Sequence, residues 1–156
     1  MPRHILIISG KKHSGKTSFL LGIIRRKKKK GYRFGGFVSK YFSTAGEYGY
    51  KAIDISSGRE FPFLTTKGRP GWEKTGRYYF VRGSIEKISK CLNPGKNRKK
   101  IIVIDEIGPA EIIRRKGLWK CLKSVLLACR NPLIITVRKE LVNKFISLPI
   151  LCRSRT

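Results

Sequence analysis

The feature that most constrains this chain is a glycine-bracketed loop near its beginning. Residues 10–17 read GKKHSGKT, which fits the pattern G-x-x-x-x-G-K-[ST], and they directly follow the apolar stretch HILIIS at residues 4–9. In such a loop the glycines let the backbone turn so tightly that successive N–H groups point inward at phosphate groups. The order of a strand, this loop and a helix therefore predicts an α/β fold that binds a nucleotide.

We expect the whole loop to contribute to nucleotide binding. The candidate nucleotide-binding residues are Gly10, Lys11, Lys12, His13, Ser14, Gly15, Lys16, Thr17 and Ser18. The ammonium group of Lys16 supplies a point charge for the phosphates, and the hydroxyl of Thr17 is a ligand for Mg²⁺. Mg²⁺ is therefore the expected cofactor.

A second motif begins at residue 101, where the sequence reads IIVIDEIGPAE. A continuous apolar run that ends in an acid is typical of a buried parallel strand whose last carboxylate meets the ligand. Asp105 is then the metal partner of Thr17, and Glu106 is the carboxylate that orients and deprotonates the water attacking the γ-phosphate. A solvated acidic turn is the alternative interpretation, and the phosphate loop argues against it.

A third apolar strand, LIITV at residues 133–137, ends in polar residues. In P-loop enzymes with an acid pair of this type, the equivalent strand lies between the two motif strands, and its polar end can sense the γ-phosphate. Thr136 is accordingly a candidate sensor. Arg138 is a candidate stabiliser of charge on the γ-phosphate, with an ordinary surface arginine as the alternative.

The remaining elements follow from periodicity and turn residues. Further strands are expected over residues 34–41, 48–55, 61–65 and 78–81, with the first two joined as a hairpin through Ala45-Gly46. Helices are expected from Lys16 to a stop at Gly31, from a Ser84 cap to about Leu92, and over residues 118–129 before Asn131-Pro132. The polar segments 67–76 and 93–100 are expected to be loops. Together these elements predict a mainly parallel central sheet with an antiparallel hairpin extension.

Length and composition limit the class of protein. The chain has 156 residues, enough for one domain over residues 1–156. It contains no long apolar run of the kind that marks a signal peptide or membrane span, so we expect a cytoplasmic location and no membrane partner. Four scattered cysteines form no metal-binding spacing and are expected to be reduced, mostly buried thiols.

The net charge is the second unusual property of the composition. Lys and Arg number 36 against 9 Asp and Glu, which gives a formal charge of +27. Such a surface favours nonspecific, salt-sensitive contact with RNA or DNA through phosphate neutralisation. No nucleic-acid recognition motif accompanies the charge, so a solvated basic surface is the favoured interpretation.

Taken together, these segments resemble the thermophile-type (THEP-type) nucleoside-triphosphatase family over most of the chain. The resemblance rests on SGKKHSGKTS at 9–18, GGFVSK at 35–40, AIDISSGRE at 52–60, GWEKTGRYYF at 71–80, VIDEIGPAE at 103–111 and LIITVRKELV at 133–142. The first and last of these segments are generic to P-loop proteins. The strand bearing Asp54, the GRYYF segment and DEIGPAE are more specific.

The resemblance implies a three-layer, RecA-like P-loop NTPase fold and Mg²⁺-dependent hydrolysis of nucleoside triphosphates, ATP and GTP among them, to NDP and phosphate. On the matching positions, Lys16 and Thr17 would contact phosphate and metal. Asp105 would bind the metal through water, and Glu106 would be the catalytic carboxylate.

Three other functions fit parts of the sequence. A GTPase switch would match D-x-x-G at residues 105–108, but no N/T-K-x-D guanine motif is present. A small-molecule kinase would need an acceptor pocket and an arginine-rich lid, for which residues 114–116 (RRK) are the candidate. A nucleotide-dependent RNA-binding module would bind without turnover. The preferred base and the oligomeric state leave no trace in the sequence.

Overall fold

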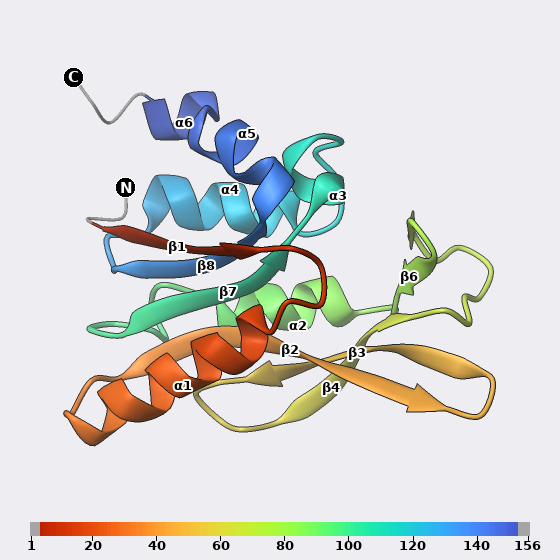
Figure 1. Cartoon of the computed structure of the whole chain (residues 1–156), viewed down its shortest axis with the longest axis horizontal. Coiled ribbons are helices and arrows are strands. Elements are labelled where there is room, and N and C mark those ends of the chain that lie inside the picture. Colours follow the sequence, from red (N-terminus) through yellow and green to blue (C-terminus); the bar gives the residue numbers. More distant parts are fainter. Residues whose placement is uncertain (1–3, 153–156) are drawn as a thin grey trace.

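A single mixed sheet of eight strands runs through the computed structural model, which describes residues 4–152 (Figure 1). The strands lie in the order β1-β8-β7-β2-β3-β4-β6-β5. Their bounds are β1 Ile5–Gly10, β2 Phe34–Thr44, β3 Glu47–Asp54, β4 Glu60–Thr65, β5 Lys74–Thr75, β6 Tyr78–Phe80, β7 Ile101–Ile107 and β8 Leu133–Arg138. In this order the first four strands, β1, β8, β7 and β2, pair in parallel. The strands that follow β2 in the sheet pair antiparallel with their neighbours.

Helices cover both faces of the sheet. They are α1 Lys16–Lys29, α2 Ser84–Cys91, α3 Pro109–Ile112, α4 Trp119–Ala128, a 3-10 turn at Lys139–Leu141, α5 Val142–Ile146 and α6 Pro149–Cys152. Helix α1 packs on one face, whereas α2, α4 and α5 pack on the other.

The central strands are apolar throughout because both of their faces are buried. In β8, Leu133 and Ile135 belong to the core under α2 and α4, whereas Ile134 belongs to the core under α1. Successive side chains of a strand point to opposite faces, so a strand between two helical layers reads as a continuous apolar run. The result is three layers with two apolar cores.

The predicted architecture is confirmed. The sheet is mainly parallel around the two motif strands β1 and β7, an antiparallel hairpin of β2 and β3 extends it, and β8 lies between β1 and β7 as expected. That one domain comprises all of residues 1–156 stays a prediction.

Two local predictions are wrong. Gly83, with φ of 78°, is the N-cap of α2, and the buried hydroxyl of Ser84 donates to the carbonyl of Phe63 (3.4 Å) instead of capping the helix. The segment 67–76 is not entirely a loop, because β5 at its end pairs with β6. The side chain of Ser84 is drawn away from the helix end by the neighbouring strand, a tertiary contact that local sequence does not encode.

Thiols and membrane segments can be assessed within residues 4–152. The four cysteines are free; Cys121 and Cys129 are buried, Cys91 is half-buried, and Cys152 is exposed, so the expectation of mostly buried thiols holds for two of them. In this range no helix has the length and apolar character needed to cross a membrane.

Candidate active site

The loop between β1 and α1 has the conformation that its glycines predict. Gly15 is left-handed with φ of 84°, and His13 has φ of 57°. A Cβ atom on Gly10 would lie 2.4 Å from the Ser14 hydroxyl oxygen, so a larger residue there would force the Ser14 side chain to move. The ammonium of Lys16 donates to the carbonyl of Lys11 at 2.8 Å, across the concave side of the loop.

A cavity of about 550 Å³ lies beside this loop and receives residues from four elements. We call it the nucleotide cavity. Its lining includes His13, Ser14, Gly15, Lys16, Thr17, Ser18, Ser39, Tyr50, Asp105 and Glu106. Of the loop residues predicted to bind nucleotide, Gly10 and Lys11 do not line it, and Lys12 lines an adjoining cavity instead.

Asp105 is the centre of the hydrogen-bond network that joins the two motifs. Its Oδ2 accepts from the hydroxyl of Thr17 (3.0 Å) and from the backbone N–H of Ser39 (2.9 Å). Its Oδ1 accepts from the hydroxyl of Thr136 (2.6 Å). These three partners belong to α1, β2 and β8, so Asp105 is held between three elements, and only 1% of its surface is exposed.

Burial raises the pKa of Asp105, and the bonds from Thr136, Ser39 and Thr17 oppose that rise because they stabilise the carboxylate. The paired hydroxyl and carboxylate oxygens are hard donors that suit Mg²⁺, which commonly uses few protein ligands together with water and phosphate oxygens. Within residues 4–152 no cluster of three or more His, Cys, Asp or Glu residues could hold a metal. The oxygens of Thr17 and Asp105 are a donor set that would fit Mg²⁺.

Glu106 leaves the strand at a bulge. The pairing of β7 with β8 shifts register between Ile104 and Ile107, and Glu106 has φ of 63°, an unusual value for a residue with a side chain. Its backbone N–H donates to the hydroxyl of Thr136 (2.6 Å). The bulge turns Glu106 out of the strand's alternation, so that its side chain lines both the nucleotide cavity and the adjoining one.

The environment of Glu106 favours the protonated form more than water does. Burial raises its pKa most, and the charge of Asp105 raises it further, whereas Arg138, Lys16 and His13 lower it. A carboxyl group with a raised pKa inside a cleft is a typical general-base candidate.

Thr136 and Arg138, the two residues proposed to respond to the γ-phosphate, have different surroundings. Thr136 is fully buried and its hydroxyl is shared between Asp105 and the backbone of Glu106, which holds the acid pair in place. Its role as a γ-phosphate sensor stays a prediction. Arg138 lines the adjoining cavity beside Glu106, and its charge-stabilising role also stays a prediction.

The sequence interpretation missed Ser39. This residue is 5% exposed, its N–H anchors Asp105, and its hydroxyl oxygen is buried with no hydrogen-bond partner within residues 4–152. Ser39 falls in the segment GGFVSK at 35–40 that carries the family resemblance, but no chemical pattern gave it a role, because its position depends on the pairing of β2 with β7, which local sequence does not reveal.

Comparisons with known proteins agree with this geometry. The model of a family described as NTPase matches residues 5–152. The nucleoside-triphosphatase THEP1 of Pyrococcus abyssi is 32% identical over 144 residues, which cover 88% of this chain and 76% of that protein. The corresponding protein of Methanocaldococcus jannaschii is 31% identical over 146 residues, covering 90% and 81%.

Solved structures show the same fold. The crystal structure of THEP1 from Aquifex aeolicus aligns with a TM-score of 0.66 at 22% identity, covering 93% of this chain and 85% of that one. The solution structure of a human cancer-related nucleoside triphosphatase aligns with a TM-score of 0.63 at 22% identity, covering 98% and 84%. The family match over nearly the whole chain, together with the phosphate loop and the acid pair, shows that this chain belongs to the THEP1-type NTPase family of P-loop nucleoside-triphosphatases.

Proposed function

We propose that this member of the family hydrolyses nucleoside triphosphates to NDP and phosphate with Mg²⁺ as cofactor and Glu106 as the general base. One observation carries the proposal. The hydroxyl of Thr17 donates to Asp105 at 3.0 Å, although 88 residues separate them in the chain. That contact joins the phosphate loop to the acid pair and is the arrangement that a metal–nucleotide complex requires.

The binding half of the site is cationic and rich in backbone donors. The loop N–H groups and Lys16 are suited to the phosphate oxygens, while Thr17 and Asp105 would hold Mg²⁺. When bound, Mg²⁺ neutralises charge on the phosphates and orients them. The residues lining the nucleotide cavity give no reason to prefer one nucleotide base over another. ATP and GTP are therefore both proposed substrates.

The chemical half of the site is Glu106. Its side chain lines the nucleotide cavity beside Asp105, which supports the proposal that it orients a water for attack on the γ-phosphorus. As the water oxygen bonds to phosphorus, its proton passes to Glu106 and the bond to the β-phosphate oxygen breaks, which releases NDP. Arg138 lines the adjoining cavity beside Glu106, and we propose that it stabilises the charge on the γ-phosphate.

The test separates binding from chemistry with two substitutions at adjacent positions. Glu106→Gln should retain affinity for Mg²⁺-ATP and lower single-turnover hydrolysis by about 10²- to 10⁴-fold, the usual contribution of a general base. Asp105→Asn should weaken Mg²⁺-ATP binding as well as turnover, because it removes the negative charge and replaces one of the two oxygens that accept hydrogen bonds with an amide nitrogen. The measurements are the nucleotide Kd and the rate of phosphate release.

Glu86→Gln, an exposed position on α2, is the matched control and should behave as the parent. Thermal unfolding of each variant should accompany the kinetics, since Asp105 is buried. Hydrolysis at the parental rate by Glu106→Gln would rule out the proposed base.

A further inference from the structure

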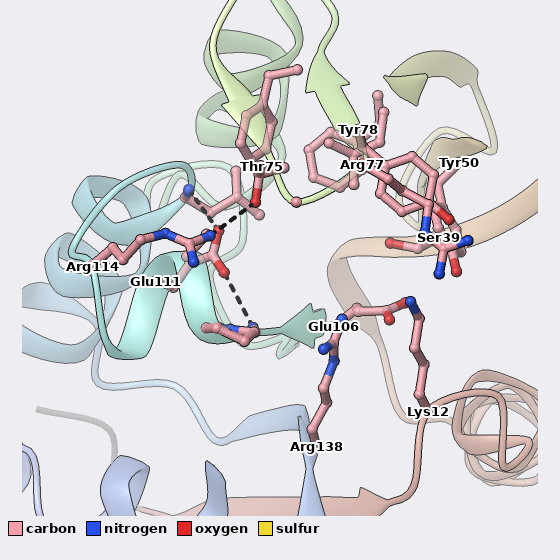
Figure 2. A pocket seen from close by; sticks show the side chains of 18 residues that line it. Lys12, Ser39, Tyr50, Thr75, Arg77, Tyr78, Glu106, Glu111, Arg114 and Arg138 are labelled. Atoms are coloured by element: carbon pink, nitrogen blue, oxygen red, sulfur yellow. Dashed lines mark hydrogen bonds between the residues drawn. The ribbon is translucent and has the colours of Figure 1, made fainter. Parts of the chain in front are cut away.

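A second cavity of about 250 Å³ adjoins the catalytic carboxylate, and we call it the anion pocket (Figure 2). It lies between the hairpin of β5 and β6, the turn from β7 to α3 and the phosphate loop. Ser39, Tyr50 and Glu106 line both this pocket and the nucleotide cavity. A molecule in the anion pocket would therefore be next to the γ-phosphate side of a bound nucleotide.

Four cations line the pocket: Arg114, which donates to the hydroxyl of Thr75 (3.4 Å), and three others from separate elements. Lys12 comes from the phosphate loop, Arg77 from the β5–β6 hairpin and Arg138 from the end of β8; in Figure 2, Lys12 and Arg138 stand beside Glu106 and Arg77 lies across from them. Within residues 4–152, the ion pairs join Lys40 and Lys51 to Glu60, so none of these three cations is in an ion pair.

These cations repel one another. The pKa of Lys12 is lowered mainly by burial and then by the charges of Arg138 and Arg77, with Glu106 opposing. The other carboxylate in the lining is that of Glu111. Its two oxygens accept hydrogen bonds from the backbone N–H groups of Gly108 and Leu118. Arg114 lies on the side of Glu111, so Lys12, Arg77 and Arg138 are left with one carboxylate, Glu106, and an anion bound between them would relieve their repulsion.

Two buried polar atoms in the lining have no hydrogen-bond partner within residues 4–152. They are the hydroxyl oxygen of Ser39 and Nε of Arg138. Buried polar groups in proteins are nearly always satisfied, so Nε of Arg138 in this pocket, together with the Ser39 hydroxyl where the two cavities meet, points to a ligand with oxygen atoms. Only 5% of the surface of Ser39 is exposed, so its hydroxyl group is held in a fixed, buried position.

The rest of the wall is aromatic. Tyr50, Tyr78, Phe63 and Phe80 line the pocket, the rings of Tyr50 and Tyr78 are 5.6 Å apart, and the guanidinium of Arg77 lies 6.0 Å from the Tyr78 ring. Flat apolar walls beside arginines favour a planar ring that carries an anionic group. The volume is below the roughly 300 Å³ at which pockets for drug-sized ligands begin, so a single ring is the size that fits.

We propose that the anion pocket binds a small phosphate ester of a planar ring, held by Arg77, Arg138 and Lys12, as a second ligand alongside the nucleoside triphosphate. A phosphate group matches the cations better than a carboxylate does, because it offers more acceptor oxygens and up to two negative charges. The meaning of a ligand beside Glu106 rests on the proposed function, whereas the binding of the phosphate ester to the pocket does not.

The experiment uses phenyl phosphate as the probe and the full chain saturated with Mg²⁺ and the non-hydrolysable analogue β,γ-imido-ATP. Calorimetry should detect binding of one phenyl phosphate, and Arg77→Ala should weaken it by at least about tenfold through loss of a charge-assisted contact. Arg82→Ala, an exposed arginine outside the pocket, is the matched control and should bind the probe as the parent does. Phenol, which lacks the phosphate, should not bind.

A further variant separates this proposal from the proposed function. Lys16→Ala should lose nucleotide binding and still bind phenyl phosphate, which would place the probe outside the nucleotide cavity. Failure of the parent to bind the probe, equal affinity in Arg77→Ala, or loss of the probe in Lys16→Ala would each overturn the anion pocket. Parental hydrolysis by Glu106→Gln would overturn the general base and leave the probe result standing.

Discussion

At the scale of single residues, Asp105 and Glu106 are neighbours in sequence but lie in different environments. Asp105 accepts three hydrogen bonds and is 1% exposed, whereas Glu106 is half-buried and open to two cavities. Thr136 connects them, because its hydroxyl donates to the first and accepts from the backbone of the second. The proposed metal ligand and the proposed base therefore arise from one strand end.

The pKa of Glu106 leads to a prediction about pH. A base must be deprotonated before it accepts a proton, and burial together with the charge of Asp105 raises this pKa above the ordinary glutamate value. The value of kcat/KM should thus fall on acidification with a midpoint above about 4.3, the unperturbed value for glutamate. Arg138→Ala, which removes the largest opposing charge, should move the midpoint to higher pH. A parental midpoint at or below the ordinary value would contradict the assignment.

Motif spacing predicted Lys16, Thr17, Asp105 and Glu106 as site candidates, because each belongs to a short pattern that local geometry explains. Ser39 and Arg77 belong to no such pattern. Their places depend on how β2 pairs with β7 and how the β5–β6 hairpin folds over the sheet. The roles of all six residues stay predictions until the variants are measured.

At the scale of elements, strand β2 packs so closely against β7 that one position excludes a side chain. Gly36 has φ of 91°, and a Cβ there would lie 2.0 Å from the carbonyl oxygen of Val103. Both the left-handed backbone and the missing volume require glycine. This contact sets the distance between the two strands that carry Ser39 and Asp105.

Gly36→Ala should accordingly destabilise the protein by more than about 2 kcal/mol, since strain at a positive φ adds to the clash with backbone. The control is the same substitution in α1, where a Cβ on Gly22 would meet only the end of Arg26 at 3.6 Å. Gly22→Ala should stabilise by about 0.5–1 kcal/mol through helix propensity. Urea unfolding measures both, and equal effects would contradict the packing argument.

The long elements were predictable from periodicity and the short ones were not. Helix α4 carries enough apolar residues to show its period, and strand β8 is long enough to show as a continuous apolar run. Helix α3 has 4 residues and strand β5 has 2, which is too few for any period to appear. The bulge at Glu106 was equally hidden, because a register shift arises from pairing with β8 and not from the strand's own residues.

At the scale of the whole molecule, the formal charge of +27 far exceeds what the active site needs. The chain should bind RNA and DNA of any sequence, and log affinity should fall linearly with log salt concentration. Lys28 and Lys29, exposed at the end of α1, are suitable probes. Replacing both with Gln should reduce the salt slope by about 0.9 for each lysine that contacts a phosphate on duplex DNA. Retention of one particular sequence above physiological salt would contradict a nonspecific surface.

The position of β8 between β1 and β7 has a consequence for how the molecule is made. A growing chain that has emerged from the ribosome as far as Pro132 already contains the phosphate loop and the acid pair, but it lacks the strand that pairs with both motif strands. Ile5 of β1 pairs with Leu133, so the first strand lacks this partner until β8 has been synthesised. Completion of the site therefore depends on synthesis of β8, and a nascent chain stalled before β8 would hold both motifs without the contacts from Thr136 that position its acids.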